Sequence, residues 1–94
     1  MVAVDEVLLD EIDRSARIEH GYRLAALKFE PEFVAEKFGE YVGQFYDRQR
    51  YDELARLVLD TYNRISPRQG ARFRASVDYS VAERRYEPIQ WTSN

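Results

Sequence analysis

The sequence contains no cysteine, which excludes disulfide bonds, thiolate metal ligands and thiol catalysis. Its single histidine, His20, is not accompanied by a Gly-x-Ser-x-Gly motif, so a Ser-His-Asp arrangement for nucleophilic catalysis is not supported. The four glycines form neither a Walker loop nor a dinucleotide-binding motif. We therefore expect a protein that is not an enzyme and that carries no cofactor.

Metal binding is not expected either. Glu32, Glu36 and Glu40 share one helical face at a spacing of four residues, but the sequence has no Glu-x-x-His motif. A tight transition-metal site would need converging ligands from a second element. The three glutamates therefore predict an acidic helix face and no metal site.

Long hydrophobic runs are also missing. The apolar stretches are short, such as residues 7–9 and 57–59, and the N-terminal region is acidic where a signal peptide would be basic. This pattern excludes a signal peptide and a transmembrane helix, and no membrane partner is expected. Together with the absence of cysteine, it favours a cytoplasmic location.

The 94 residues that are present suffice for one small domain. A hydrophobic content of 45% can close a core, so we expect a single compact domain over residues 1–91 with a flexible tail at 92–94. The net charge of −3 is too small to indicate which class of partner the protein binds.

Apolar residues at helical spacing predict a first helix over residues 5–20. Residues 22–29 fit either a short strand, which we favour, or a continuation of that helix across Gly21. Pro31 starts a second helix that runs to about Tyr46, and polar residues at 47–50 separate it from a third. Ser66 and Pro67 end the third helix.

The period changes from helical to two after residue 70. Apolar and polar residues alternate from Ala71 to Val81, which predicts a half-buried strand. Residues 86–91 can return beside it as an edge strand that contains Pro88. The predicted fold class is α+β, with three helices followed by a C-terminal antiparallel β-hairpin and, if residues 22–29 are extended, a further short strand.

That element order is similar to the order in winged-helix modules. The resemblance implies that the third helix enters the major groove of DNA and that Arg84 and Arg85 form the tip of the wing. A nucleic-acid-binding transcriptional regulator is therefore the alternative function. On the third helix, however, Arg56 and Arg64 alternate with Asp52 and Asp60, which is more typical of a solvated salt-bridge ladder.

Basic and aromatic residues gather in the last third of the chain. Residues 64–94 carry six arginines and three acids, whereas residues 1–63 carry eight basic and fourteen acidic side chains. Arg, Tyr and Trp are enriched at interface hot spots, so the first hypothesis is a small non-catalytic protein-interaction module: a regulator, inhibitor or accessory subunit with a protein partner. Its predicted partner-binding residues lie on the hairpin and are Arg72, Arg74, Arg84, Arg85, Tyr86 and Trp91.

Two alternatives compete with this hypothesis. The arginines could protect a sheet edge, or they could pair with the acidic N-terminal half within one chain or between two. Aromatic residues at regular spacing, including Tyr41, Tyr62, Phe73 and Tyr79, are expected in the core.

Three small residues, Ala35, Gly39 and Gly43, form a stripe on the second helix. Each glycine inside a helix costs about 0.5–1 kcal/mol relative to alanine, so a compensating contact is expected. The stripe predicts close approach of another helix, either from the same chain or across a homodimer interface.

Overall fold

The computed structural model describes residues 16–91, so the first part of the predicted helix at 5–20 and the predicted tail at 92–94 lie outside the described residues. A first helix covers residues 16–28 of this range. It is followed by α2 (Pro31–Phe45), α3 (Arg48–Ile65) and α4 (Pro67–Glu83). Residues 16–91 contain no strand, so the predicted α+β class is wrong and the described fold is all-helical.

Local capping signals set the limits of these helices. Pro31 occupies the first turn of α2, where its missing N–H costs nothing, and the Asp47 side chain accepts a hydrogen bond of 2.8 Å from the Arg50 amide at the start of α3. The hydroxyl of Ser66 accepts from the Gln69 amide at 3.1 Å and caps α4. The predicted limits of the second helix and the predicted end of the third are therefore confirmed, whereas the third helix begins at Arg48, within the break predicted at 47–50.

The predicted strand at 71–81 is wrong because these residues belong to α4. The side of α4 that faces the core carries Phe73, Val77 and Val81, all buried, whereas Ala75 and Tyr79 are exposed. Positions four residues apart fit both the period of two of a strand and the period of a helix, so the alternation could not distinguish a strand from a helix. The Ser66-Pro67 pair ends α3 and also begins the next helix.

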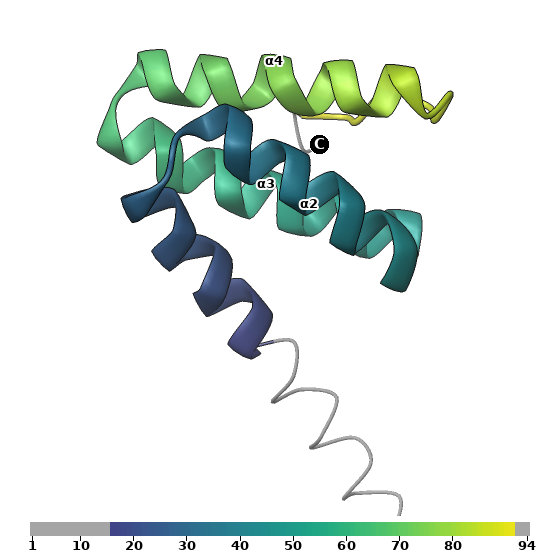
Figure 1. Cartoon of the computed structure of the whole chain (residues 1–94), viewed down its shortest axis with the longest axis horizontal. Coiled ribbons are helices and arrows are strands. Elements are labelled where there is room, and N and C mark those ends of the chain that lie inside the picture. The colour runs from purple at the N-terminus through teal and green to yellow at the C-terminus, as the bar shows by residue number, and fades with distance from the viewer. Residues whose placement is uncertain (1–15, 92–94) are drawn as a thin grey trace, which may run out of the picture.

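The other two predicted strands are wrong as well. Residues 22–28 continue the first helix through Gly21, as the alternative interpretation had it. Residues 86–91 have no strand partner within the described chain and fold back on the helices (Figure 1). Ile89 is buried in the core, and the Trp91 indole N–H donates to Asp78 Oδ1 at 2.9 Å. Without a hairpin there is no wing, and the winged-helix interpretation is wrong.

Three helices, α2, α3 and α4, pack around the core, and α4 contacts both of the others (Figure 1). Helix 16–28 leaves this bundle at an angle; its Ala26 is buried, and its Tyr22 ring packs edge-on against Phe38 at 5.4 Å. Rings meet at the centre, with Phe73 lying 5.3 Å from Tyr62 and 6.4 Å from Phe38. Aromatic rings thus lie at the centre of a core that is shared by all four described helices.

The end of α4 forms a Schellman motif. The amide of Tyr86 donates to Val81 O at 3.0 Å, and the amide of Arg85 donates to Ala82 O at 3.0 Å. This closure requires a left-handed residue after the C-cap, and Arg85 supplies it with φ 58°. A non-glycine residue in that conformation is strained. The motif turns the chain back toward α3.

Candidate interaction surfaces

The six predicted partner-binding residues do not gather on one surface. Arg72 lies near the start of α4, where its Nη2 is 2.7 Å from Glu30 Oε2 and its Nε is 2.8 Å from Glu32 Oε2. The hydrogen bond from Arg72 holds the pKa of the Glu32 carboxyl below its usual value. Arg84 lies twelve positions further on, about 18 Å along the helix. Arg72 therefore joins α4 to the start of α2 and does not share a patch with Arg84.

The structure brings only some of the other predicted residues together. Arg74 lies 5.7 Å above the ring of Trp91, and Arg84 Nη1 donates to the hydroxyl of Ser80. Arg85 and Tyr86 follow the end of α4 in the turn described above. Arg74 and Arg84 thus contact neighbouring groups of the same chain.

The small-residue stripe faces α4 along most of its length. Ala35 and Gly39 are buried, and a methyl group on Gly39 would lie 2.8 Å from Ser80 Oγ. A methyl group on Gly43 would meet only Tyr51, at 3.9 Å, which is an ordinary contact. The side of α2 that carries Ala35 and Gly39 is thus covered by the chain itself.

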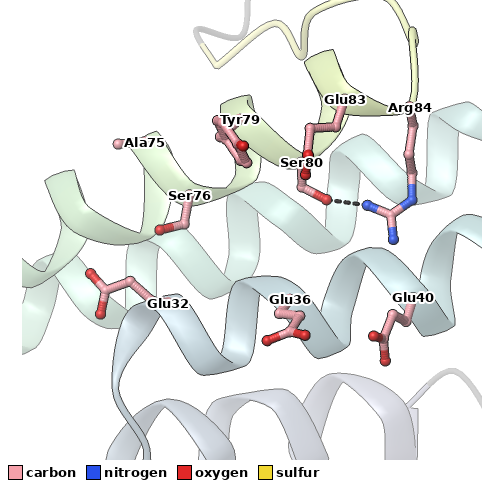
Figure 2. A pocket seen from close by; sticks show the side chains of 9 residues that line it. All are labelled: Glu32, Glu36, Glu40, Ala75, Ser76, Tyr79, Ser80, Glu83 and Arg84. Carbon is pink, nitrogen blue, oxygen red and sulfur yellow. Dashed lines mark hydrogen bonds between the residues drawn. The ribbon is translucent and has the colours of Figure 1, made fainter.

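A groove of about 510 Å³ lies between α2 and α4 (Figure 2). Figure 2 shows Glu32, Glu36 and Glu40 in a row along α2, opposite the α4 side chains. Among the described residues, Glu36 and Glu83 have no ion-pair partner, whereas Glu40 pairs with Lys37 at 3.6 Å. No group of three or more acidic or histidine side chains within residues 16–91 is arranged to hold a metal ion. The groove is a negatively charged surface, and the full lining is Glu32, Glu36, Glu40, Ala75, Ser76, Tyr79, Ser80, Glu83 and Arg84.

Exposed rings lie on α2 and just before it, and we name Phe29, which precedes the helix, together with Phe33, Tyr41 and Phe45 the aromatic row. Their exposed fractions are 51%, 47%, 46% and 67%, respectively. The rings associate in two pairs, Phe29 with Phe33 at 5.3 Å and Tyr41 with Phe45 at 5.0 Å. Lys37 stands between the pairs, with Nζ 5.7 Å from the Phe33 ring. A hollow of about 450 Å³ beside the row is lined by Tyr22, Lys37, Glu40, Tyr41, Gln44 and Phe45.

Sequence reasoning missed this row because it expected the aromatic positions of α2 to be buried. Val34, Phe38 and Val42 already fill the core side of the helix. The row from Phe33 through Tyr41 to Phe45 lies one position away from that core row. Its repeated spacing of four residues is visible in the sequence, but the buried row has the same spacing, so the pattern alone does not mark the row as exposed. Tyr79, also expected in the core, is likewise exposed.

A third feature is a cavity of about 290 Å³, which we name the tyrosine cavity; it is lined by Gly43, Tyr46, Arg48, Tyr51, Tyr86 and Glu87. Arg48 lies 5.4 Å from the ring of Tyr51 and 5.8 Å from the ring of Tyr86. Tyr51 is only 3% exposed, and its hydroxyl has no hydrogen-bond partner in the described part of the chain. Burial raises the pKa of this hydroxyl, so it is neutral and able to donate.

Comparison of the chain with protein-family models, with curated proteins and with solved structures finds no match. None of the helices described over residues 16–91 is long and apolar enough to cross a membrane. The function is therefore argued from the surfaces themselves.

Proposed function

We propose that this protein is a non-catalytic protein-interaction module that binds an amphipathic helix with basic flanks through the aromatic row on α2. The observation that carries the proposal is the exposure of four large rings, three of which lie on one ridge of α2. With roughly 200 Å² per aromatic side chain, these exposed fractions leave about 400 Å² of aromatic surface open. Apolar patches of this size on a monomer are often functional.

The charge of the neighbouring groove specifies the partner. Glu36 and Glu40 precede Lys37 and Tyr41 by one helical position, so their carboxylates border the aromatic row. Glu36 has no ion-pair partner among the described residues, and Glu83 faces the same groove from α4. A helix that covers the row would place its flanks near these carboxylates, which favours lysine or arginine there.

The spacing of the row suits a helical partner. Phe33, Tyr41 and Phe45 lie on a single ridge of residues four apart that extends about 18 Å along α2. Such ridges pack into the grooves of a second helix at a crossing angle of about 50°. About three turns of a partner would cover the ridge, with its apolar residues as anchors.

This proposal keeps the class of function that the sequence predicts and moves the site from the end of the chain to α2. Three of the arginines predicted to bind a partner, Arg72, Arg74 and Arg84, make contacts within the chain. The aromatic row has no such internal cover.

Two synthetic helical peptides with the same leucine and tryptophan face provide the test, one flanked by lysines and the other by glutamates. We expect fluorescence anisotropy to show binding of the lysine-flanked peptide at least tenfold tighter, with a difference that shrinks as salt is added. The double variant Phe33→Ala, Phe45→Ala should weaken binding at least tenfold. Ile65→Ala removes an exposed apolar side chain from the end of α3 and is the matched control, which should bind like the parent.

Two kinds of result would overturn the proposal. One is equal binding of both peptides, or binding that the double variant leaves unchanged while circular dichroism shows a retained fold. The other is a solution mass of twice 11.2 kDa that falls to that of one chain in the double variant, because a second copy would then occupy the row.

A further inference from the structure

One position of the ridge on α2 carries a charge in place of a ring. The ridge consists of residues four apart, and its member between Phe33 and Tyr41 is Lys37. The Nζ atom of Lys37 lies 5.7 Å from the Phe33 ring, so the charge lies beside the aromatic row. A helix that covers the row therefore also covers this lysine. Removing a charged group from water is unfavourable unless the group gains partners.

Lys37 forms an ion pair with Glu40, and both side chains are accessible. The Nζ atom is 3.6 Å from Glu40 Oε2, and the two side chains are 53% and 50% exposed. This distance is longer than that of a hydrogen bond, and neither side chain makes a hydrogen bond within residues 16–91. The N–H donors of Lys37 and the carboxylate oxygens of Glu40 are thus open to a partner.

The ion pair also lies at the hollow of about 450 Å³ beside the aromatic row, because Lys37 and Glu40 both line it. An apolar side chain in this hollow would contact the rings of Tyr41 and Phe45 but would leave the covered ion pair without hydrogen bonds. A cationic side chain would be repelled by Lys37, and an anionic one by Glu40. The hollow therefore favours a neutral side chain that can both accept and donate hydrogen bonds.

A primary amide has this chemistry. Its carbonyl oxygen is an acceptor and its NH₂ group is a donor, and the two lie on different atoms of one planar group. Such a group suits an ammonium and a carboxylate that are 3.6 Å apart, because it can contact both at once.

We infer that the partner helix carries one glutamine or asparagine within its apolar face and that this amide bridges Lys37 and Glu40. The amide oxygen accepts from Lys37 Nζ, and the NH₂ group donates to the carboxylate of Glu40. A single polar residue within an apolar interface fixes the register of two helices, as it does in coiled coils. The inference rests on the proposed function and names the residue that sets the register of the partner on the aromatic row.

The test uses the lysine-flanked peptide and a series in which each residue of its apolar face in turn is replaced by glutamine. We expect fluorescence anisotropy to show one glutamine position that binds about tenfold tighter than the unsubstituted peptide, because the covered ion pair there gains hydrogen bonds. Glutamate or lysine at that position should bind more weakly than glutamine, since each meets a like charge.

The double variant Lys37→Met, Glu40→Met separates binding from folding. It removes one charge of each sign, so the net charge of the protein is unchanged. We expect the unsubstituted peptide to bind at least as tightly as it binds the parent, whereas the preference for glutamine disappears. The matched control is Asp60→Met, Arg64→Met, which removes an exposed ion pair of 2.9 Å from α3 and should keep the preference.

Three results would overturn the inference: no glutamine position that binds tighter than the unsubstituted peptide, tighter binding of glutamate than of glutamine, or a glutamine preference that survives in Lys37→Met, Glu40→Met. Each leaves the proposed function standing if the unsubstituted peptide binds and depends on Phe33 and Phe45. If no lysine-flanked peptide binds, the proposed function fails and this inference fails with it.

Discussion

Replacing Gly70 with alanine tests how closely α3 and α4 approach each other. A methyl group on Gly70 would lie 1.7 Å from Asn63 Oδ1 and 3.3 Å from Asn63 Cα. The exposed Asn63 side chain can swing away, but the contact with its Cα requires a shift of the α3 backbone. Such overpacking costs about 1–3 kcal/mol, whereas the gain in helix propensity is about 0.5–1 kcal/mol. We expect Gly70→Ala to lower the free energy of unfolding by about 1 kcal/mol.

Gly21→Ala is the control for this experiment. It makes the same chemical change inside a helix, but nothing lies within 4 Å of the added methyl group. The gain in helix propensity then stands alone, and we expect a rise of about 0.5–1 kcal/mol. In a domain of this size, 1 kcal/mol corresponds to about 4–8 °C in melting temperature, so the two variants should melt on opposite sides of the parent.

Urea unfolding followed by far-ultraviolet circular dichroism measures both changes. The double variant Asn63→Ala, Gly70→Ala removes the colliding side chain and should recover part of the loss, as a positive coupling in the double-mutant cycle. If Gly70→Ala proves as stable as Gly21→Ala, the two helices do not approach as the structure shows and the reasoning is refuted.

Four further predictions follow from single contacts. Arg85→Gly should stabilise the protein by about 1 kcal/mol in urea unfolding, because glycine adopts the left-handed conformation at φ 58° without strain; a loss of stability would contradict the Schellman motif. Tyr62→Phe should cost about 1 kcal/mol in the same assay, since it removes the hydrogen bond to Phe29 O, and an unchanged midpoint would refute that bond. Burial raises the pKa of Tyr62 to about 12, so the unfolded chain ionises first and the melting temperature should decline from about pH 10 to pH 12, less steeply in Tyr62→Phe. The hydrogen bond from Arg72 lowers the pKa of Glu32 in the folded protein, so the ion pair stabilises the fold at pH values above the pKa of an unfolded glutamate. This stabilisation is lost as the pH falls through the pKa of Glu32 in the folded protein. NMR titration should show this pKa return toward normal in Arg72→Ala.

Some of the helix ends could be predicted from sequence because they depend on local chemistry. Pro31 at the start of α2 and Ser66 at the end of α3 act through their own backbone and side chains, whatever the rest of the fold does. The type of the last element could not be decided in this way. Phe73, Val77 and Val81 fit a strand and a helix equally well, and only the packing of α4 on α2 and α3 separates the two.

The candidate site was harder to predict than the helix ends. The sequence shows that aromatic residues are abundant, but it does not show which of them the core can hold. Once Phe38 and Val42 occupy the inner side of α2, Tyr41 and Phe45 remain outside. Exposure of a ring therefore depends on how many other residues compete for the core, and that competition is settled only in three dimensions.

Charge shows the same difference between a count along the chain and an arrangement in space. The last third of the chain has an excess of arginine, yet Arg72 is paired with Glu30 and Glu32. Arg84 is turned onto Ser80 at the end of the groove, beside the carboxylates of α2. Pairing within the chain thus consumes part of the basic excess, and carboxylates such as Glu36 are left to face outward among the described residues. A partner that approaches α2 meets exposed rings bordered by negative charge, which is why the proposed partner is basic although the last third of the chain is rich in arginine.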